Sequence, residues 1–303
     1  MDGDAVAERV RSFYQRHPYP PPVDDLDEYR RRWQDPQRRR ADHHLFWPAR
    51  PYREDPSILI AGCGTSQAAR HAMRWPRARV TGIDFSDTSL RSTEALKAKY
   101  DLANLTVREL SVERAGELGA TFDQIICTGV LHHLPDPASG AAAVASVVRD
   151  GGRLVYWVYG RENNEWITRF VDPVRRSLTS KIPSEPLRAL SAVPAAAIWA
   201  AIKLLYRPGP DGSGPRHLPY GQYFASMYTF PFDELLSIVF DQLVTPVAYY
   251  LPRAEVEAWF QGPGFEDVSL RWHNEMSWTA TATVVRAAAT GGGSAESPAR
   301  SVG

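Results

Sequence analysis

Cysteine is scarce in this 303-residue sequence, and the scarcity excludes a fold built on disulfides. Only Cys63, in a glycine-rich turn, and Cys127, in an expected strand, are present. A disulfide framework of the kind that stabilises small secreted domains needs more. The first ten residues are charged and lack the apolar core of a signal peptide. We therefore expect a cytoplasmic protein with reduced thiols.

An excess of charge of either sign is also missing. Lys and Arg number 35, as do Asp and Glu, so the formal net charge is zero. No overall field draws the protein to nucleic acid or to an acidic membrane, and we do not expect nucleic acid as a partner. Two arginine triplets, at 30–32 and 38–40, keep that alternative open. The Asp and Glu residues around them favour a solvated helix face.

Clean apolar runs of membrane-spanning length are absent too. One unusually apolar helix is expected over residues 189–206, but Pro194 and Lys203 interrupt it and it is at the short limit for a span. We expect no transmembrane segment and favour a helix buried within a cap. Interfacial lipid contact or a homodimer face are the alternatives that this apolar surface leaves open.

The chain is organised around residues 58–66, which read I-L-I-A-G-C-G-T-S. The three apolar residues predict a strand buried on both faces of a parallel sheet. Gly62 and Gly64 predict a turn whose backbone can pass close to a ligand, and residues 67–75 predict a helix after it. Strand, glycine turn and helix N-terminus form an arrangement in which free N–H groups bind a negatively charged group.

The spacing after this turn favours a nucleoside over a dinucleotide. A dinucleotide fingerprint would have a third glycine at position 67, where this chain has Gln67. A second strand over 79–83 leads into Asp84, 20 residues after Gly64. An acidic side chain there can accept hydrogen bonds from both hydroxyls of a ribose. NAD is therefore not expected as the ligand.

Three motifs in order carry a family resemblance. They are A-G-C-G-T at 61–65, G-I-D at 82–84 and F-D-Q-I-I-C-T-G-V-L-H-H-L-P-D-P at 122–137. With them the chain resembles the class I S-adenosyl-L-methionine (SAM) dependent methyltransferases of the small-molecule type. The resemblance is strong over 56–150 and continues through 151–160. It implies an α/β fold with a Rossmann-like, seven-stranded sheet and SAM as cofactor.

The resemblance also implies which residues bind the cofactor. The glycine turn would contact the methionine portion, Asp84 the ribose, and Ser111 and Val112 the adenine. The family usually has an Asp just after the third strand, where this chain has L-S-V-E at 110–113. The full set implied is Ala61, Gly62, Cys63, Gly64, Asp84, Phe85, Ser111, Val112, Thr128, Gly129 and Val130.

Methyl transfer from SAM requires few proton-transfer steps from the protein. The nucleophile must be held in line with the SAM methyl group, and a general base is needed only if that nucleophile carries a proton. His132 and His133 are the candidates for that base. The pattern favours the alternative that both are structural parts of the family motif. A metal site is not expected, because no Cys or carboxylate completes a ligand set around either His-His pair.

We divide the chain into five segments. Residues 1–50 are an expected N-terminal helical lid, 51–160 the SAM-binding core and 161–251 a helical cap inserted after the fifth strand. Residues 252–286 add a helix and a strand pair that complete the core, and 287–303 are an expected disordered tail. Aromatic residues of the cap, among them Phe224, Tyr228 and Tyr249, are expected to face the methyl acceptor.

The expected function is methyl transfer from SAM to a small, apolar or aromatic molecule. A methyltransferase that acts on tRNA or protein is one alternative, which the arginine triplets keep open. A SAM-binding protein without transferase activity is another, because the usual adenine-site Asp is replaced.

Overall fold

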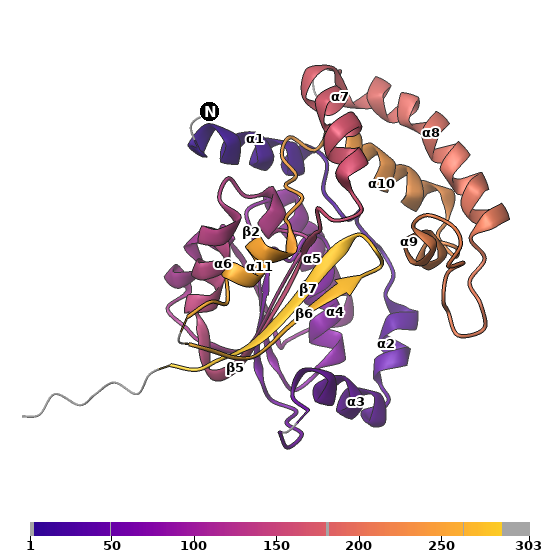
Figure 1. Ribbon diagram of the computed structural model, residues 1–303. Coiled ribbons are helices and arrows are strands. Elements are labelled where there is room, and N and C mark those ends of the chain that lie inside the picture. The colour runs from indigo at the N-terminus through magenta and orange to yellow at the C-terminus, as the bar shows by residue number, and fades with distance from the viewer. Residues whose placement is uncertain (1–2, 49, 180–181, 263, 287–303) are drawn as a thin grey trace, which may run out of the picture.

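A single seven-stranded sheet forms the centre of the protein (Figure 1). The computed structural model describes residues 3–48, 50–179, 182–262 and 264–286. The strands are β1 (Ser57–Ala61), β2 (Arg79–Asp84), β3 (Leu105–Glu109), β4 (Phe122–Thr128), β5 (Val148–Tyr159), β6 (Phe265–His273) and β7 (Ser277–Val284). Their order is β3-β2-β1-β4-β5-β7-β6. β1 to β5 are parallel, and β7 is antiparallel to both β5 and β6. The predicted seven-stranded α/β fold is confirmed.

The central strand β1 is apolar because helices cover both faces of the sheet. Ile58 and Ile60 point into one core cluster, and Leu59 between them points into the other. All three are fully buried, as expected for a strand between two layers. The helices that follow the strands are α4 (Gln67–Arg74), α5 (Asp87–Tyr100), η1 (Val112–Leu118), η2 (Leu131–His133) and α6 (Pro137–Ser146).

The strand order reverses beside β1, and this places the site. β1 pairs with β2 on one side and with β4 on the other. The loops after β1 and β4 therefore leave in opposite directions and open a crevice at the carboxyl ends of the strands. Both predicted motifs, the glycine turn and the loop after β4, lie there.

The amino-terminal segment crosses this carboxyl edge. It contains α1 (Gly3–Arg16), α2 (Asp27–Trp33) and α3 (Pro36–Phe46). The carbonyl of Tyr14 accepts a hydrogen bond from Ser86 Oγ at 3.2 Å, and that of Pro20 accepts one from Thr65 Oγ1 at 2.9 Å. The segment is thereby attached to the loops that follow β1 and β2.

Residues 161–251 leave the end of β5 and return to it. They form η3 (Ile167–Val171), α7 (Asp172–Ser177), α8 (Ser184–Leu205), α9 (Gly221–Ser226) and α10 (Phe232–Val244). Leu251 then bridges Gly160, and α11 (Arg253–Ala258) leads to the last two strands. η3 is a π-helical turn that leads directly into the short α7.

The expectation that the apolar helix 189–206 is buried is wrong. α8 packs one face on α10, through Leu187, Ser191, Ala195 and Ile202. On its other face Val193 is 74% exposed and Leu204 is 80% exposed. One side of α8 is covered by α10, by α9 and by the loop between them. A helix with one covering layer buries one stripe.

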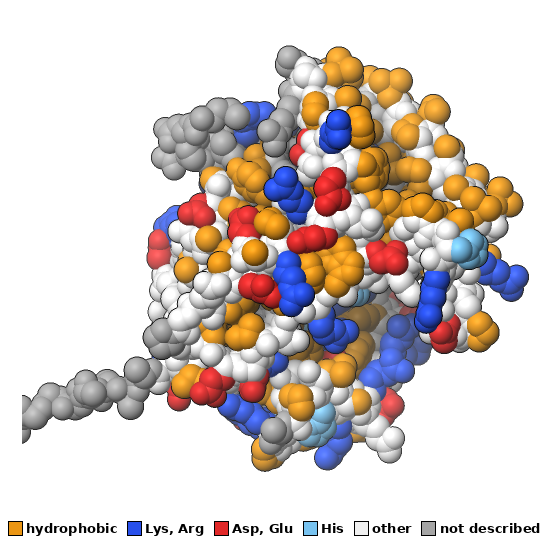
Figure 2. All heavy atoms as spheres, viewed as in Figure 1, with side chains coloured by type: hydrophobic (Ala, Val, Ile, Leu, Met, Phe, Trp, Pro, Cys, Tyr) orange, Lys and Arg blue, Asp and Glu red, His pale blue; other side chains and the backbone are white. Residues whose placement is uncertain are grey.

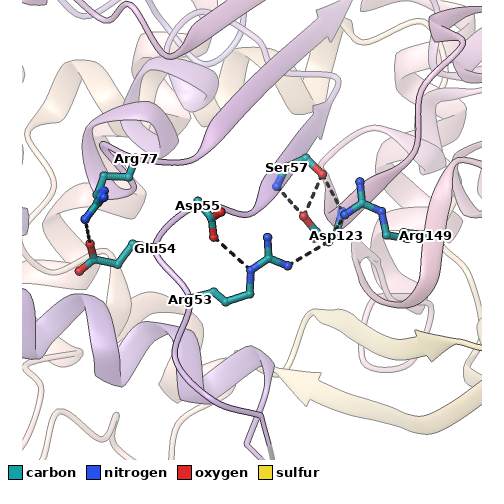
Figure 3. A network of polar contacts seen from close by, with 7 residues as sticks. All are labelled: Arg53, Glu54, Asp55, Ser57, Arg77, Asp123 and Arg149. Atoms are coloured by element: carbon teal, nitrogen blue, oxygen red, sulfur yellow. Dashed lines mark hydrogen bonds and ion pairs between the residues drawn. The ribbon is translucent and has the colours of Figure 1, made fainter.

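A polar network joins the strands at the opposite edge of the sheet (Figure 3). The Asp123 carboxylate, at the start of β4, accepts hydrogen bonds from Ser57 N at 2.7 Å and from Ser57 Oγ at 3.0 Å. It also pairs with Arg149 at 2.5 Å and with Arg53 at 3.5 Å. These bonds fix β1 beside β4 at their amino ends.

Candidate functional site

A cavity of about 360 Å³ lies at the carboxyl ends of β1, β2, β4 and β5. Its core wall includes Gly62, Gly64, Gln67, Asp84, Phe85, Thr128, Gly129 and Val130. The amino-terminal segment adds Val10, Tyr14, Tyr19 and Pro20, and β5 adds Trp157 and Tyr159. The size suits a small ligand, and the position is the crevice that the strand order creates.

A second cavity of about 260 Å³ adjoins the first and reaches the end of β3. The two share Val10, Phe85, His133 and Leu134. Ser111 lines the smaller cavity and Val112 the larger. Both residues that were expected to flank an adenine are therefore at the boundary of the two spaces.

The glycine turn brings backbone close to the cavity. Gly62 has a φ of +72°, and a Cβ built on it would lie 2.2 Å from Val130 Cγ2. No side chain fits at this position. The N–H groups of Gly62 and Cys63 both donate to the Ile83 carbonyl, at 2.8 and 2.9 Å. The prediction that N–H groups of this turn are free for an anion is wrong for these two, because the end of β2 lies beside them.

Asp84 is the acidic centre of the site. Its carboxylate accepts hydrogen bonds from Gly64 N and from Ser86 N, each at 2.9 Å. The residue is 9% exposed, and its burial raises the pKa of the carboxyl while the backbone N–H bonds oppose that rise. Each oxygen retains a second lone pair. Asp84 can therefore accept the hydroxyls of a ribose within the cavity that it lines.

The other expected cofactor residues separate into two groups. Phe85, Thr128, Gly129 and Val130 line the larger cavity. Ala61 and Cys63 are fully buried and are not among the described residues that line either cavity. Burial raises the pKa of the Cys63 thiol well above its usual value, and both cysteines are free.

Gln67 belongs to the site, although the sequence analysis noted it only as the residue that replaces the third glycine of a dinucleotide motif. It lines the cavity, and its Oε1 accepts a hydrogen bond from Thr128 Oγ1 at 3.2 Å. The side chain thus joins the start of α4 to the end of β4. It occupies the region where a dinucleotide fold needs a third glycine for close helix packing.

His132 and His133 have different environments. The His132 ring is fully buried, and its centroid lies 4.0 Å from that of Tyr159. Within the described residues neither of its nitrogens has a hydrogen-bond partner, and burial lowers its pKa well below the usual value. It is not among the described residues that line the cavities. The turn η2 directs this ring into the protein, where it packs under the site.

His133 lines both cavities. Its Nδ1 lies 2.7 Å from the carbonyl oxygen of Val247. Because a carbonyl only accepts, Nδ1 carries the proton, and Nε2 of the neutral ring carries a lone pair. Burial lowers the pKa of His133 to about 4. The ring is therefore neutral near pH 7 and able to take a proton at Nε2.

Four aromatic residues of the cavity were not identified from the sequence as site residues. Trp157 and Tyr159 lie two residues apart at the carboxyl end of β5, so their side chains share one face of the sheet. The period-two pair at the end of an expected strand is a signal that could have found them. Tyr14 and Tyr19 are far from the core in sequence, and burial raises the pKa of both phenols.

The cap aromatics lie behind the site. None of the described residues that line the larger cavity comes from 161–251. Phe224 and Tyr228 pack with Trp199 in a separate apolar cluster, so the expectation that they face an acceptor is not met. Tyr250 does stack on Tyr159, with ring centroids 5.4 Å apart. The cap thus supports the cavity wall from outside.

Asp241 of α10 is a buried acid behind this wall. Its carboxylate accepts a hydrogen bond from Thr245 Oγ1 at 2.8 Å. Burial raises the pKa of Asp241 to about 6, and its charge in turn helps to raise the pKa of Tyr14 and Tyr159. The cap therefore contains a carboxyl group whose ionised form is destabilised by burial.

The substitution Asp241→Asn should change how stability depends on pH. A carboxyl whose pKa is raised on folding favours the folded state at low pH, and this contribution is lost as pH rises through about 6. Relative to the native protein, the variant should gain about 3 kcal/mol of unfolding free energy between pH 4 and pH 7, from about two pKa units. Urea unfolding across this range measures the gain. Asp233→Asn, at an exposed position on the same helix, is the control, and equal slopes for both variants would contradict the assignment.

Comparison with known proteins matches this part of the chain. A family model described as a methyltransferase domain matches residues 59–154. The match runs from β1 into β5 and includes the glycine turn, Asp84 and the loop after β4. Residues 59–154 are thus similar to a methyltransferase domain.

Relatives and solved structures agree with the domain assignment. An uncharacterized protein of Synechococcus sp. is 36% identical over 162 residues, which are 52% of this chain and 38% of the relative. A ubiquinone biosynthesis O-methyltransferase of Albidiferax ferrireducens is 33% identical over 115 residues, 38% of this chain and 45% of the relative. The chain thus spans less than half the length of these relatives. The structure of PKMT2 from Rickettsia typhi has the same fold, with a TM-score of 0.55, 13% identity and coverage of 83% of this chain and 53% of the other.

The residues of this matched region fit SAM, the cofactor of class I methyltransferases. Asp84 supplies acceptors for the ribose hydroxyls, and the side-chain-free Gly62 leaves room that a Cβ would fill. Val112 offers an apolar surface at the boundary of the two cavities, where a base would lie. The site therefore has the chemistry that the nucleoside part of SAM requires.

Proposed function

We propose that this protein transfers the methyl group of SAM to a hydroxyl of a small, aromatic and largely apolar molecule. One observation carries the proposal. The cavity that contains the ribose-binding Asp84 continues to a wall of Tyr14, Trp157 and Tyr159, with the neutral His133 beside it. Aromatic rings of this kind accommodate a planar, apolar acceptor. The relatives named as O-methyltransferases support oxygen as the acceptor atom.

In this proposal each of the described segments of the chain has a role in binding or in folding. Residues 1–50 act as a lid, because Val10, Tyr14 and Tyr19 of this segment line the cavity. Residues 51–160 bind SAM, 161–251 support the acceptor side, and 252–286 complete the sheet. The tail 287–303, expected to be disordered, lies outside the described residues.

The protein's own residues contribute position and one proton acceptor. SAM, when bound, supplies an electrophilic methyl group. Asp84 holds the ribose, and the aromatic wall orients the acceptor and excludes water from the reacting oxygen. His133 Nε2 takes the hydroxyl proton as the oxygen attacks, with Nδ1–H held by the Val247 carbonyl. This nitrogen is unprotonated above about pH 4, so it is available at neutral pH.

The test is methyl transfer from labelled SAM to a panel of phenols, amines and thiols that carry apolar tails of increasing length. We expect label in phenols, and we expect calorimetry to show binding of SAM but not of NAD. The substitution His133→Ala should lower kcat about 100-fold, with a SAM Kd that stays within about threefold. His44→Ala, at an exposed histidine, is the matched control. Binding of SAM without transfer to any acceptor, or NAD binding in its place, would overturn the proposal.

A further inference from the structure

The outer face of α8 is apolar, and no described residue covers it. The buried residues Leu187, Ser191, Ala195 and Ile202 follow one stripe of this 22-residue helix, and that stripe rests on α10. The opposite face exposes Leu190, Val193 and Leu204 by 60–80%, and Leu205 is 57% exposed at the carboxyl end of the helix. Figure 2 shows hydrophobic side chains together in the upper right of the molecule, where Figure 1 places α8. A monomeric protein seldom leaves such a continuous surface without a partner.

No charged side chain interrupts this outer face. Between Arg188 and Arg207 the one charged residue is Lys203. Its ammonium is turned inward, where it donates to the carbonyl of Tyr228 and lies 5.3 Å from the centre of the Trp199 ring. The two arginines at its ends are exposed. Between residues 189 and 205 the outer surface of α8 is therefore an apolar strip with a cation at each end, and the exposed Glu185 precedes the first of these cations.

The segments before and after α8 also expose apolar side chains and carry an excess of positive charge. Phe170 is 62% exposed and Leu178 is 58% exposed, in or just after η3 and α7. Residues 161–220 contain nine Lys and Arg against five Asp and Glu, a formal charge of +4, whereas the whole chain has a formal charge of zero. The positive charge of the protein is thus concentrated in the segment that also exposes its apolar side chains.

A lipid surface fits these observations better than a second copy of the chain. The strip covers residues 189–205 of α8 and is about 26 Å long at 1.5 Å per residue. At a width of about 10 Å it covers about 260 Å². A stable protein interface needs about 800 Å² from each partner. Two copies joined at α8 would also bring two segments of charge +4 together. Anionic headgroups instead attract those cations while the apolar strip enters the acyl region.

We propose that α8 lies flat on an anionic lipid bilayer, with Leu190, Val193 and Leu204 immersed in it. By length and composition α8 is apolar enough to cross a membrane. Crossing would remove Leu187 and Ile202 from α10 and strip the Lys203 ammonium of its carbonyl partner. Lying in the interface keeps all of these contacts. This inference concerns surface binding and does not depend on the proposed methyl transfer.

The test is co-sedimentation of the full chain with vesicles of phosphatidylcholine, with and without phosphatidylglycerol. We expect binding to the anionic vesicles that weakens as salt is added. The variant Leu190→Ser, Val193→Ser, Leu204→Ser, Leu205→Ser should bind at least about tenfold less, because the three immersed side chains and the exposed Leu205 at the end of the helix are lost. Leu45→Ser is the matched control, since Leu45 is 77% exposed on α3.

Four further measurements accompany vesicle binding. All substituted side chains are exposed, so the thermal transition and SAM binding of the variant should equal those of the native protein. Equal vesicle binding by the native and the fourfold variant would overturn the proposal. So would a dimer in light scattering that the fourfold variant abolishes without any vesicle binding, because it would assign the face to a second copy. Transfer to a water-soluble phenol should be the same in both proteins, which separates this test from that of the enzyme.

Discussion

The substitution Asp84→Ala should weaken SAM binding by about 1.5–3 kcal/mol, the scale for the loss of hydrogen bonds to a charged group. The carboxylate lines the cavity at 9% exposure, so water does not replace the lost acceptor without cost. Titration calorimetry measures the change as an increase in Kd of about 10-fold to 150-fold. An unchanged Kd would remove Asp84 from the ribose site.

Two controls separate binding from folding in this experiment. The Asp84 carboxylate also accepts the N–H groups of Gly64 and Ser86, so its removal leaves two buried donors and should lower the unfolding free energy by about 1–3 kcal/mol for each. Asp84→Asn retains an amide oxygen, and should lose less stability while still losing SAM affinity. Asp87→Ala, an acid three residues on with a half-exposed side chain, should leave SAM binding unchanged.

Adding a single methyl group at Gly62, by the substitution Gly62→Ala, should lower both the stability and the SAM affinity of the protein strongly. The new Cβ would lie 2.2 Å from Val130 Cγ2, at a backbone φ of +72°. The left-handed conformation costs about 1–2 kcal/mol, and displacement of Val130 into the cavity costs about 1–3 kcal/mol more, as is typical of overpacking. We expect a fall in unfolding free energy and a loss of SAM binding, measured by urea unfolding and by calorimetry.

Two control variants separate the conformational cost of Gly62→Ala from its collision with Val130. Gly119 has a φ of +61°, and no atom of the described residues lies within 4 Å of the position that a Cβ would take there. Gly119→Ala should therefore show the conformational cost alone and bind SAM normally. Adding Val130→Ala to Gly62→Ala removes the collision and should restore part of the stability. If Gly62→Ala behaves like Gly119→Ala, the close contact with Val130 does not shape the cofactor site.

The local chemistry of the sequence was enough to predict the sheet and its cofactor end. A run such as Ile58 to Ile60 has one stable environment, between two helical layers, and it therefore marks a central parallel strand. Asp84 follows a strand and so lies at the carboxyl edge, where the crevice of this fold is found. Both inferences depend on residues that are neighbours in the chain. The central strands of the sheet and the place of Asp84 at its carboxyl edge followed from them.

Tertiary structure decided everything that depended on a partner distant in sequence. His132 and His133 are adjacent and identical, yet only His133 meets both the cavity and the Val247 carbonyl, 114 residues away. The aromatic wall of the cavity combines Tyr14 from the first helix with Tyr159 from the fifth strand, a pairing that no local pattern encodes. α8 has the composition of a buried helix, but burial requires a covering layer on both sides and the described fold supplies one. Composition determines which surfaces are apolar, and the arrangement of distant segments determines which of them remain uncovered.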